Sequence, residues 1–485
     1  FKCQVKDIFS YTTIERLSQH LNSNESVVSI KSEQGPLKGT FGLLPIQQWF
    51  IEQVEEGTLP APNHWNQSFL IKVPKLDKDR LYPILEKLVD YHDVLRIQYL
   101  PEDWQQAYQS SIALTELKTL DVNKLSPEAI QRTLTHWQSG FNLEKGPLFQ
   151  IGYLSGYEDG SARVFLALHH MIVDGVSWRL LTEDIKTLYE EKDLPPKGSS
   201  YRQWVESIKN YPEQHPQEAS YWEARLSDIQ TYQFADYKKE APSSASLELN
   251  KTLTKSLLQN ASKAYRTEIN DLLLTALAYA LKKINGENVQ GITLEGHGRE
   301  DIDPSIDHSR TVGWFTSMFP VRLELHNTLK ESIRSVKEGL RNIPNKGIGF
   351  GAFATEKKSG YSHKDLTPVN FNYLGQLDLK KEDWQLVAEA SGKAIHPDNT
   401  DHSLININGM VSDGKLRFSI VTKLGEKTTH QLSDSLKDHL LAIIEHCTEK
   451  LDKEGPGYTP SDFKLVGISQ SLLDRLQFEK HTHEK

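Results

Sequence analysis

The sequence predicts an α/β protein built from two substantial domains. Its 485 residues exceed what a single hydrophobic core usually supports. Short apolar strands and amphipathic helices mix along the whole chain, which is the pattern of the α/β and α+β classes. A helix followed by a strand and a polar loop occurs in both halves, although the two halves share no residue-level repeat.

Composition excludes several classes of function. The formal net charge is −9, which argues against nucleic acid or an anionic membrane as a partner. No apolar run is long enough to cross a membrane, and the N-terminus has no signal-peptide pattern. The two cysteines, Cys3 and Cys447, lie far apart, which is typical of a reducing cytoplasm. We therefore expect a cytoplasmic, monomeric protein, and the initial Phe1 indicates a fragment of a longer chain.

Three segments precede or form the first domain. Residues 1–25 contain a capping-box pattern between Thr12 and Glu15 and a short helix, and they are predicted to be the end of another unit. Residues 26–40 are polar and are predicted to be a linker. Residues 41–235 form the first domain, with predicted helices over Leu81–His92 and Pro127–Phe141 and predicted strands over Gln67–Val73, Leu95–Leu100, Phe149–Leu154 and Arg163–His170.

Residues 236–465 form the second predicted domain. The polar stretch 236–246 is expected to be the junction between the two domains. Predicted helices cover Thr267–Lys283 and Gln431–Lys450, and predicted strands cover Val289–Leu294, Val321–Leu325, Asn370–Tyr373, Leu404–Met410 and Leu416–Thr422. Residues 466–485 follow as a separate segment with a polar helix over Ser469–Glu479.

The strand Arg163–His170 ends in two adjacent histidines. The strand is apolar on both faces, so the pair is expected to lie inside the molecule. Imidazole has an ordinary pKa near neutrality, so a histidine at this position is a candidate acid or base catalyst. We expect Asp174 to orient the pair or compensate its charge, and Gly175 to permit the turn into the next helix. Ser177 is expected to cap that helix.

The same residues allow two other interpretations. A histidine at a strand end can be a core residue whose hydrogen bonds are satisfied. A metal site made of His169, His170 and Asp174 is disfavoured, because adjacent strand residues point to opposite faces and cannot readily share one ion. For the same reason, only one of the two histidines can face a given cavity.

A second polar loop follows the strand Val289–Leu294. Glu295 begins it, and glycines at 296 and 298 leave room for a ligand or another backbone to approach closely. The glutamate could be a carboxylate paired with Arg299 or Arg310. Alternatively, it could be a second acid or base that acts opposite the histidine.

Three further segments carry candidate functional groups. Residues 311–320 are rich in aromatic and small hydroxylated side chains, and could line a channel or pack a core. Residues 344–351 contain three glycines but lack the Lys-Ser/Thr ending of a phosphate-binding P-loop, so nucleotide binding is not expected. Asn372 and Tyr373 lie near the end of a strand, where they could hydrogen-bond a developing enolate oxygen or satisfy backbone groups.

In this order, the motifs resemble the epimerization domain of nonribosomal peptide synthetases, within the condensation-domain and chloramphenicol acetyltransferase-like superfamily. The matching segments are Leu44–Phe50, His169–Trp178, Thr267–Leu274, Glu295–Glu300, Thr311–Pro320, Pro344–Gly351 and Phe371–Gln376. The histidine motif alone is shared with condensation domains and related acyltransferases. The Glu295–Glu300 and Asn372–Gln376 runs are similar to the epimerase branch.

The resemblance implies a fold of two chloramphenicol acetyltransferase-like lobes in a V-shaped pseudo-dimer, with the site in a tunnel between them. It implies epimerization of the α-carbon of an L-aminoacyl or peptidyl thioester, carried on the 4'-phosphopantetheine of a carrier domain, to an L/D mixture. No intrinsic cofactor and no metal are implied. The alternative is a condensation domain that joins two carrier-bound substrates through a peptide bond.

The resemblance also assigns roles to residues. His170 and Glu295 become the acid-base pair, and Tyr373 and Asn372 support the enolate or relay a proton. Three residues are implied to support the site structurally, namely Asp174, His169 and Gly175. Two residues are implied to line the substrate channel, namely Trp314 and Ser317.

The implied partners are other parts of a synthetase. Residues 1–25 resemble the last helix of the preceding peptidyl carrier domain and lack its phosphopantetheine-bearing serine. The expected partners are that upstream carrier domain, the adenylation domain of the same module, and a downstream condensation domain or synthetase. Residues 466–485 would dock to this downstream partner or continue into another domain.

Overall fold

The computed structural model describes residues 13, 15–18, 29–112, 117–230, 234, 237, 239–355, 360–377, 383–387, 389–400, 403–463 and 467–483. The prediction for residues 1–25 therefore falls mostly outside the described residues. Within the described part, no helix is both long and apolar enough to cross a membrane.

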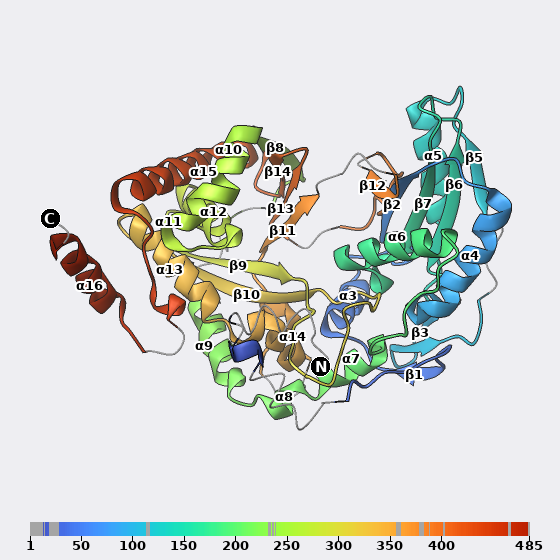
Figure 1. The fold of residues 1–485 in the computed structure, drawn as a ribbon, viewed down its shortest axis with the longest axis horizontal. Coiled ribbons are helices and arrows are strands. Elements are labelled where there is room, and N and C mark those ends of the chain that lie inside the picture. Colours follow the sequence, from blue (N-terminus) through green and yellow to red (C-terminus); the bar gives the residue numbers. More distant parts are fainter. Residues whose placement is uncertain are drawn as a thin grey trace.

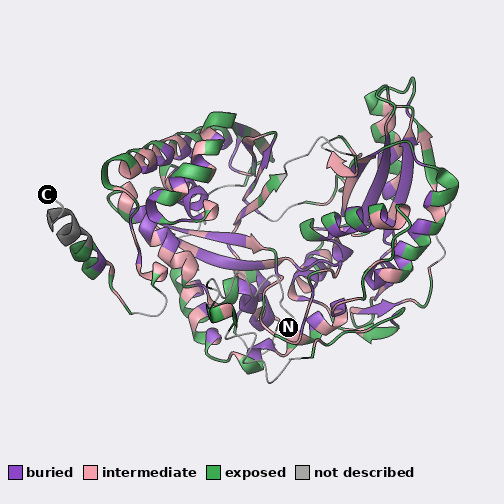
Figure 2. Cartoon of the chain, viewed as in Figure 1, coloured by how far each residue is buried: buried purple, intermediate pink, exposed green. Residues whose placement is uncertain are grey.

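The N-terminal lobe is built on a five-stranded sheet with the order β12-β2-β7-β6-β5 (Figure 1). Its strands are β2 (Asn66–Val73), β5 (Lys118–Asp121), β6 (Phe149–Ser155), β7 (Ala162–His169) and β12 (Gln385–Val387). β5 and β6 run parallel, and the other neighbours are antiparallel. All eight residues of the central strand β7 are buried, as expected from its apolar character on both faces (Figure 2).

Helices and a small sheet complete this lobe. The helices are α3 (Pro45–Glu55), α4 (Lys78–Tyr91), α5 (Pro127–Gln138), α6 (Gly175–Tyr189), α7 (Tyr201–Lys209), α8 (Tyr211–Gln214) and α9 (Glu218–Gln230). The small sheet has the order β1-β4-β3, with β1 (Gly39–Phe41), β3 (Ile97–Leu100) and β4 (Gln105–Tyr108). The last helix, α9, packs against strands of the other lobe, so this end of the region assigned to the first domain joins the two lobes.

The C-terminal lobe contains a six-stranded sheet with the order β10-β9-β11-β13-β14-β8. Its strands are β8 (Ser243–Leu249), β9 (Val289–Gly296), β10 (Ser317–Glu324), β11 (Val369–Leu377), β13 (Ile405–Ser412) and β14 (Lys415–Thr422). Its helices are α10 (Lys251–Ser256), α11 (Ser262–Tyr265), α12 (Ile269–Asn285), α13 (Leu329–Arg341), α14 (Ile348–Ala354) and α15 (Glu426–Glu454), and α16 (Gln470–His483) follows. α12 is buried along most of its middle, from Asp271 to Leu281, and packs against α15 (Figure 1).

One segment crosses from the second half of the chain to the first lobe. β12 pairs with β2, and Arg163 of β7 forms an ion pair with Glu389 at 2.6 Å. Further along, an isolated bridge joins Trp65 to Ile395. The sheet of the first lobe is therefore completed by residues that the sequence assigns to the second.

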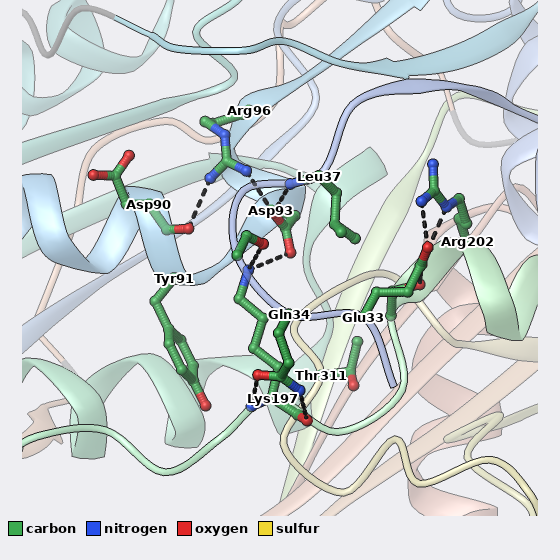
Figure 3. A network of polar contacts seen from close by, with 12 residues as sticks. Glu33, Gln34, Leu37, Asp90, Tyr91, Asp93, Arg96, Lys197, Arg202 and Thr311 are labelled. Carbon is green, nitrogen blue, oxygen red and sulfur yellow. Dashed lines mark hydrogen bonds and ion pairs between the residues drawn. The ribbon is translucent and has the colours of Figure 1, made fainter. Parts of the chain in front are cut away.

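The segment before the first lobe is fastened to it by a polar network (Figure 3). The Arg202 guanidinium donates to Glu33, and the Leu37 amide donates to Asp93 at 2.9 Å. The Lys197 ammonium also contacts Asp93, at 2.7 Å. The described part of the predicted linker contains no helix before β1. Polar and charged side chains hold it against the first lobe.

Several element predictions need correction. The expected junction at 236–246 overlaps the edge strand β8. Every second residue of β8 is exposed, so its sequence resembles a polar linker. Asp174, and not Ser177, caps α6, because its carboxylate accepts the Ser177 amide at 2.8 Å. Gly175 is the first residue of that helix and has no positive φ, and an added Cβ would meet no atom within 4 Å, so its local backbone does not require glycine.

Candidate active site

The two histidines at the end of β7 have different surroundings. His169 is fully buried, with its Nε2 donating to the Pro62 carbonyl at 2.7 Å and its Nδ1 accepting the Met171 amide at 3.2 Å. Desolvation lowers the pKa of His169 to about 4. Both ring nitrogens thus form hydrogen bonds with the backbone, and His169 is a neutral core residue.

His170 begins the turn after β7 and keeps part of its surface exposed. Its ring contacts two indoles that also contact each other: Trp65 stacks on it at 4.9 Å between ring centroids, and Trp314 is tilted against it at 4.6 Å. Desolvation by these surroundings lowers the pKa of His170 to about 4. The imidazole is therefore neutral at neutral pH, the state that a general base needs.

Asp174 does not hydrogen-bond either histidine. Its carboxylate caps α6 and accepts two hydrogen bonds from the Arg299 guanidinium at 3.1 Å. It also accepts the Phe315 amide at 3.2 Å. Both partners of this ion pair are buried, so Asp174 links the histidine motif to the second polar loop and anchors both.

Glu295 lies within β9, one residue beyond the predicted end of that strand. The Asn372 side-chain amide, on the neighbouring strand β11, donates to its carboxylate at 2.8 Å. The two arginines suggested by the sequence form ion pairs with other carboxylates, Arg299 with Asp174 and Arg310 with Asp184. The structure therefore brings two of the predicted site residues, Glu295 and Asn372, into direct contact.

Tyr373 follows Asn372 on β11, and the register of β11 with β13 shifts between Tyr373 and Gln376. Burial raises the pKa of its hydroxyl to about 12. The phenol thus stays protonated at neutral pH and can donate a hydrogen bond. His297, the other histidine of the loop, is half exposed and contacts Glu300 at 3.2 Å.

Gly298 of the loop lies against the backbone of another segment. Gly298 has a φ of +65°, and a Cβ placed there would lie 1.6 Å from the Phe315 carbonyl oxygen. The space predicted for a ligand or a backbone is therefore filled by residues 315–317 at this position. This close contact, like the Asp174–Arg299 pair, fixes the loop relative to the segment that carries Trp314.

That segment connects the two candidate acid-base groups. Trp314 contacts the His170 ring, and Met318 lies directly opposite Glu295 in the β9–β10 ladder. Trp314 and Met318 are four positions apart, so their Cα atoms can be at most about 14 Å from each other. The strand register thus brings the histidine of one lobe and the glutamate of the other to the two ends of a single short segment.

A small hollow lies beside this segment. Ser317 lines it together with apolar residues such as Phe315, Met318 and Trp204, whereas Trp314, His170 and Glu295 do not. Of the two predicted channel residues, Ser317 thus reaches a cavity and Trp314 packs on the imidazole. Among the described residues, no group of three or more His, Cys, Asp or Glu side chains is placed to hold a metal ion.

Sequence reasoning missed two residues that contact His170. Gln67 of β2 lies 2.8 Å from its Nε2, and Trp65 stacks on its ring. For Gln67 the signal available was the run of polar residues, Asn66, Gln67 and Ser68, that begins strand β2.

Residues 38–460 match the condensation domain family. The chain belongs to the condensation domain family. Gramicidin S synthase 1 of Brevibacillus brevis is 36% identical, covering 98% of this chain and 45% of that protein. Tyrocidine synthase 1 of Brevibacillus parabrevis is 33% identical, covering 98% of this chain and 46% of that protein. The chain thus spans less than half the length of these relatives.

A solved structure supports the same assignment. The crystal structure of the epimerization domain from the third module of tyrocidine synthetase B has a TM-score of 0.76 and 33% identity. The alignment covers 87% of this condensation-family chain and 100% of the solved epimerization domain. The predicted resemblance to synthetase domains and the predicted α/β fold of chloramphenicol acetyltransferase-like lobes are therefore confirmed.

Proposed function

We propose that this condensation-family domain epimerizes the α-carbon of an L-aminoacyl or peptidyl thioester carried on phosphopantetheine, giving an L/D mixture. The observation that carries the proposal is the contact between the Asn372 amide and the Glu295 carboxylate. Glu295 lies opposite Met318, on the short segment whose Trp314 contacts the His170 ring. A condensation reaction promoted by the histidine needs no such carboxylate. Similarity to a solved epimerization domain adds support.

The reaction needs one group to remove the α-proton and another to return a proton to the opposite face. The electron pair of the broken C–H bond moves into the thioester carbonyl to form an enolate. Neutral His170 can accept a proton at Nε2, and Glu295 is the second acid-base group. Such proton transfer contributes roughly 10²–10⁴-fold to a rate.

Tyr373 and Asn372 have supporting roles in this proposal. The raised pKa of Tyr373 keeps its phenol protonated, so it can donate to the enolate oxygen. Asn372 orients the Glu295 carboxylate through its hydrogen bond. The substrate arm belongs to the carrier domain, and the upstream carrier domain, the adenylation domain and a downstream synthetase remain the proposed partners.

The test combines the domain with an L-aminoacyl carrier and, in a second reaction, with an additional loaded acceptor carrier. The amino acid is released by thioester hydrolysis and its chirality is measured. We expect D-amino acid in both reactions and no dipeptide. Glu295→Gln should reduce D-amino acid formation by at least about 100-fold.

The matched control is Glu300→Gln, a carboxylate in the same loop that pairs with Lys346 at 3.2 Å. It should retain D-amino acid formation. Dipeptide formation without D-amino acid would contradict the proposal and favour condensation.

A further inference from the structure

The imidazole of His170 is part of a hydrogen-bonded chain that spans three elements. Gln67 on β2 uses its side-chain nitrogen to contact His170 Nε2 at 2.8 Å. Its side-chain oxygen accepts the indole N–H of Trp178, on α6, at 2.7 Å. On the other side of the ring, Nδ1 lies 3.1 Å from the Val173 carbonyl oxygen.

The chemistry of the end groups fixes the direction of each hydrogen bond. An indole nitrogen can only donate, so the atom of Gln67 that faces Trp178 must be the oxygen. The Gln67 amide nitrogen must then face His170, and an amide nitrogen can only donate. At the other nitrogen, the Val173 carbonyl can only accept. Nδ1 therefore carries the proton, and the one lone pair of Nε2 accepts the Gln67 N–H.

We propose that Gln67, held by Trp178, is a positioning residue that fixes the Nδ1–H tautomer of His170 and opposes protonation at Nε2. A proton placed on Nε2 would face the two hydrogens of the Gln67 amide. The amide cannot turn to offer its oxygen without breaking the bond from Trp178. His170 thus gains no acceptor from Gln67 when it becomes an imidazolium.

The role of Gln67 in the reaction, unlike the tautomer of His170, rests on the proposed epimerization. A base that is unprotonated at rest, and that has no neighbour to retain the proton it takes, can return that proton readily. Because Nε2 has one lone pair, the substrate proton can bind there only as the Gln67 hydrogen bond breaks. The amide restores that bond when the proton leaves, so His170 can act in both directions of an epimerization. Gln67 itself takes no proton.

The charged and titratable groups around the ring are few among the described residues. On the turn after β7, Asp174 favours the charged imidazole but is paired with Arg299. His169 precedes it on β7 and is neutral. The groups that touch the ring from β2 and from the 311–317 segment are uncharged, so a carboxylate introduced at position 67 would be the dominant new electrostatic influence.

The direct test is the protonation of the His170 ring nitrogens, measured by long-range ¹⁵N–¹H correlation on ¹⁵N-histidine-labelled protein at pH 7. The His170 signals are identified as those that disappear in His170→Ala. We expect Nδ1 protonated and Nε2 unprotonated. A proton on Nε2 in the wild-type protein would overturn the inference, whatever reaction the domain catalyses.

Two variants test the role of the amide. Gln67→Glu supplies an acceptor for an Nε2 proton, so we expect the pKa of His170 to rise by about 2 units. The acid limb of the pH profile for D-amino acid formation should move upward with it. Trp178→Phe keeps an aromatic ring at position 178 but removes the indole N–H, so the Gln67 amide can turn. The pKa of His170 and the acid limb of the pH profile should both rise, by less than in Gln67→Glu.

Gln150→Glu is the matched control. Gln150 lies on β6, on the other side of β7, and its side-chain nitrogen donates to the Ile151 carbonyl at 2.8 Å. This variant should leave the His170 titration unchanged. An unchanged titration in both Gln67→Glu and Trp178→Phe would contradict the role of the relay. If the tautomer is as expected but the wild-type domain forms no D-amino acid, the proposed function fails while the assignment of the tautomer stands.

Discussion

At the scale of single residues, burial decides the protonation of the histidine pair. Strand alternation predicts that only one of the two can face a cavity. In the structure the backbone forms hydrogen bonds with both nitrogens of His169, whereas the His170 ring keeps part of its surface exposed. The partners of the His170 ring were not predictable. Gln67 precedes it by 103 positions, and only the pairing of β2 with β7 brings the two together.

Burial of His169 makes the stability of the domain dependent on pH. Its pKa is about 4 in the folded protein and about 6.5 when unfolded, so between these values the unfolded chain binds the extra proton. The free energy of unfolding should therefore fall as the pH is lowered from about 6.5 to 4, with His169 contributing about 3 kcal/mol.

The check is urea denaturation of the wild type and His169→Gln across this range. The variant lacks the titrating ring, so its free energy of unfolding should fall less steeply toward low pH. Equal slopes in the two proteins would contradict the assignment of a neutral, buried His169.

At the scale of elements, hydrophobic periodicity predicts the long strands and helices well. The strand Phe149–Leu154 and the helix Gln431–Lys450 both lie inside observed elements, β6 and α15. β8 was missed, because alternate exposed residues on an edge strand resemble a polar linker. β12 was missed because three residues gain stability only from pairing with β2, which is distant in sequence.

The contact between the glutamate loop and the segment before β10 depends on Gly298. Gly298→Ala would place a methyl group against the Phe315 carbonyl and would also strain a positive φ. We expect a loss of about 2–4 kcal/mol in the free energy of unfolding, because the cost of overpacking adds to the strain of a positive φ, which alone is about 1 kcal/mol. Chemical denaturation measures it.

Gly286 provides the control, since its φ is also positive, at +80°, but no atom lies within 4 Å of an added Cβ. Gly286→Ala should cost only the backbone strain. Similar losses for the two alanine variants would show that close contact at Gly298 is not what fixes the loop.

At the scale of the whole molecule, the two lobes meet where their polar motifs lie. The Asp174–Arg299 pair, the Trp314–His170 contact and the β9–β10 register connect the histidine of one sheet to the glutamate of the other. The sequence supplies both groups and, through the family resemblance, their pairing. Periodicity alone could not predict the Asp174–Arg299 pair, because the tertiary arrangement of the lobes sets it.

The central claim is that His170 and Glu295 exchange the α-proton of a thioester substrate. The most direct measurement is mass-spectrometric detection of deuterium at the α-carbon, after an L-aminoacyl carrier is incubated with the domain in D₂O. The account predicts rapid deuterium uptake with D-isomer for the wild type. It predicts a loss of L-to-D conversion by at least about 100-fold in both His170→Ala and Glu295→Gln. The absence of deuterium uptake by the wild type, or retained L-to-D conversion in either variant, would contradict it.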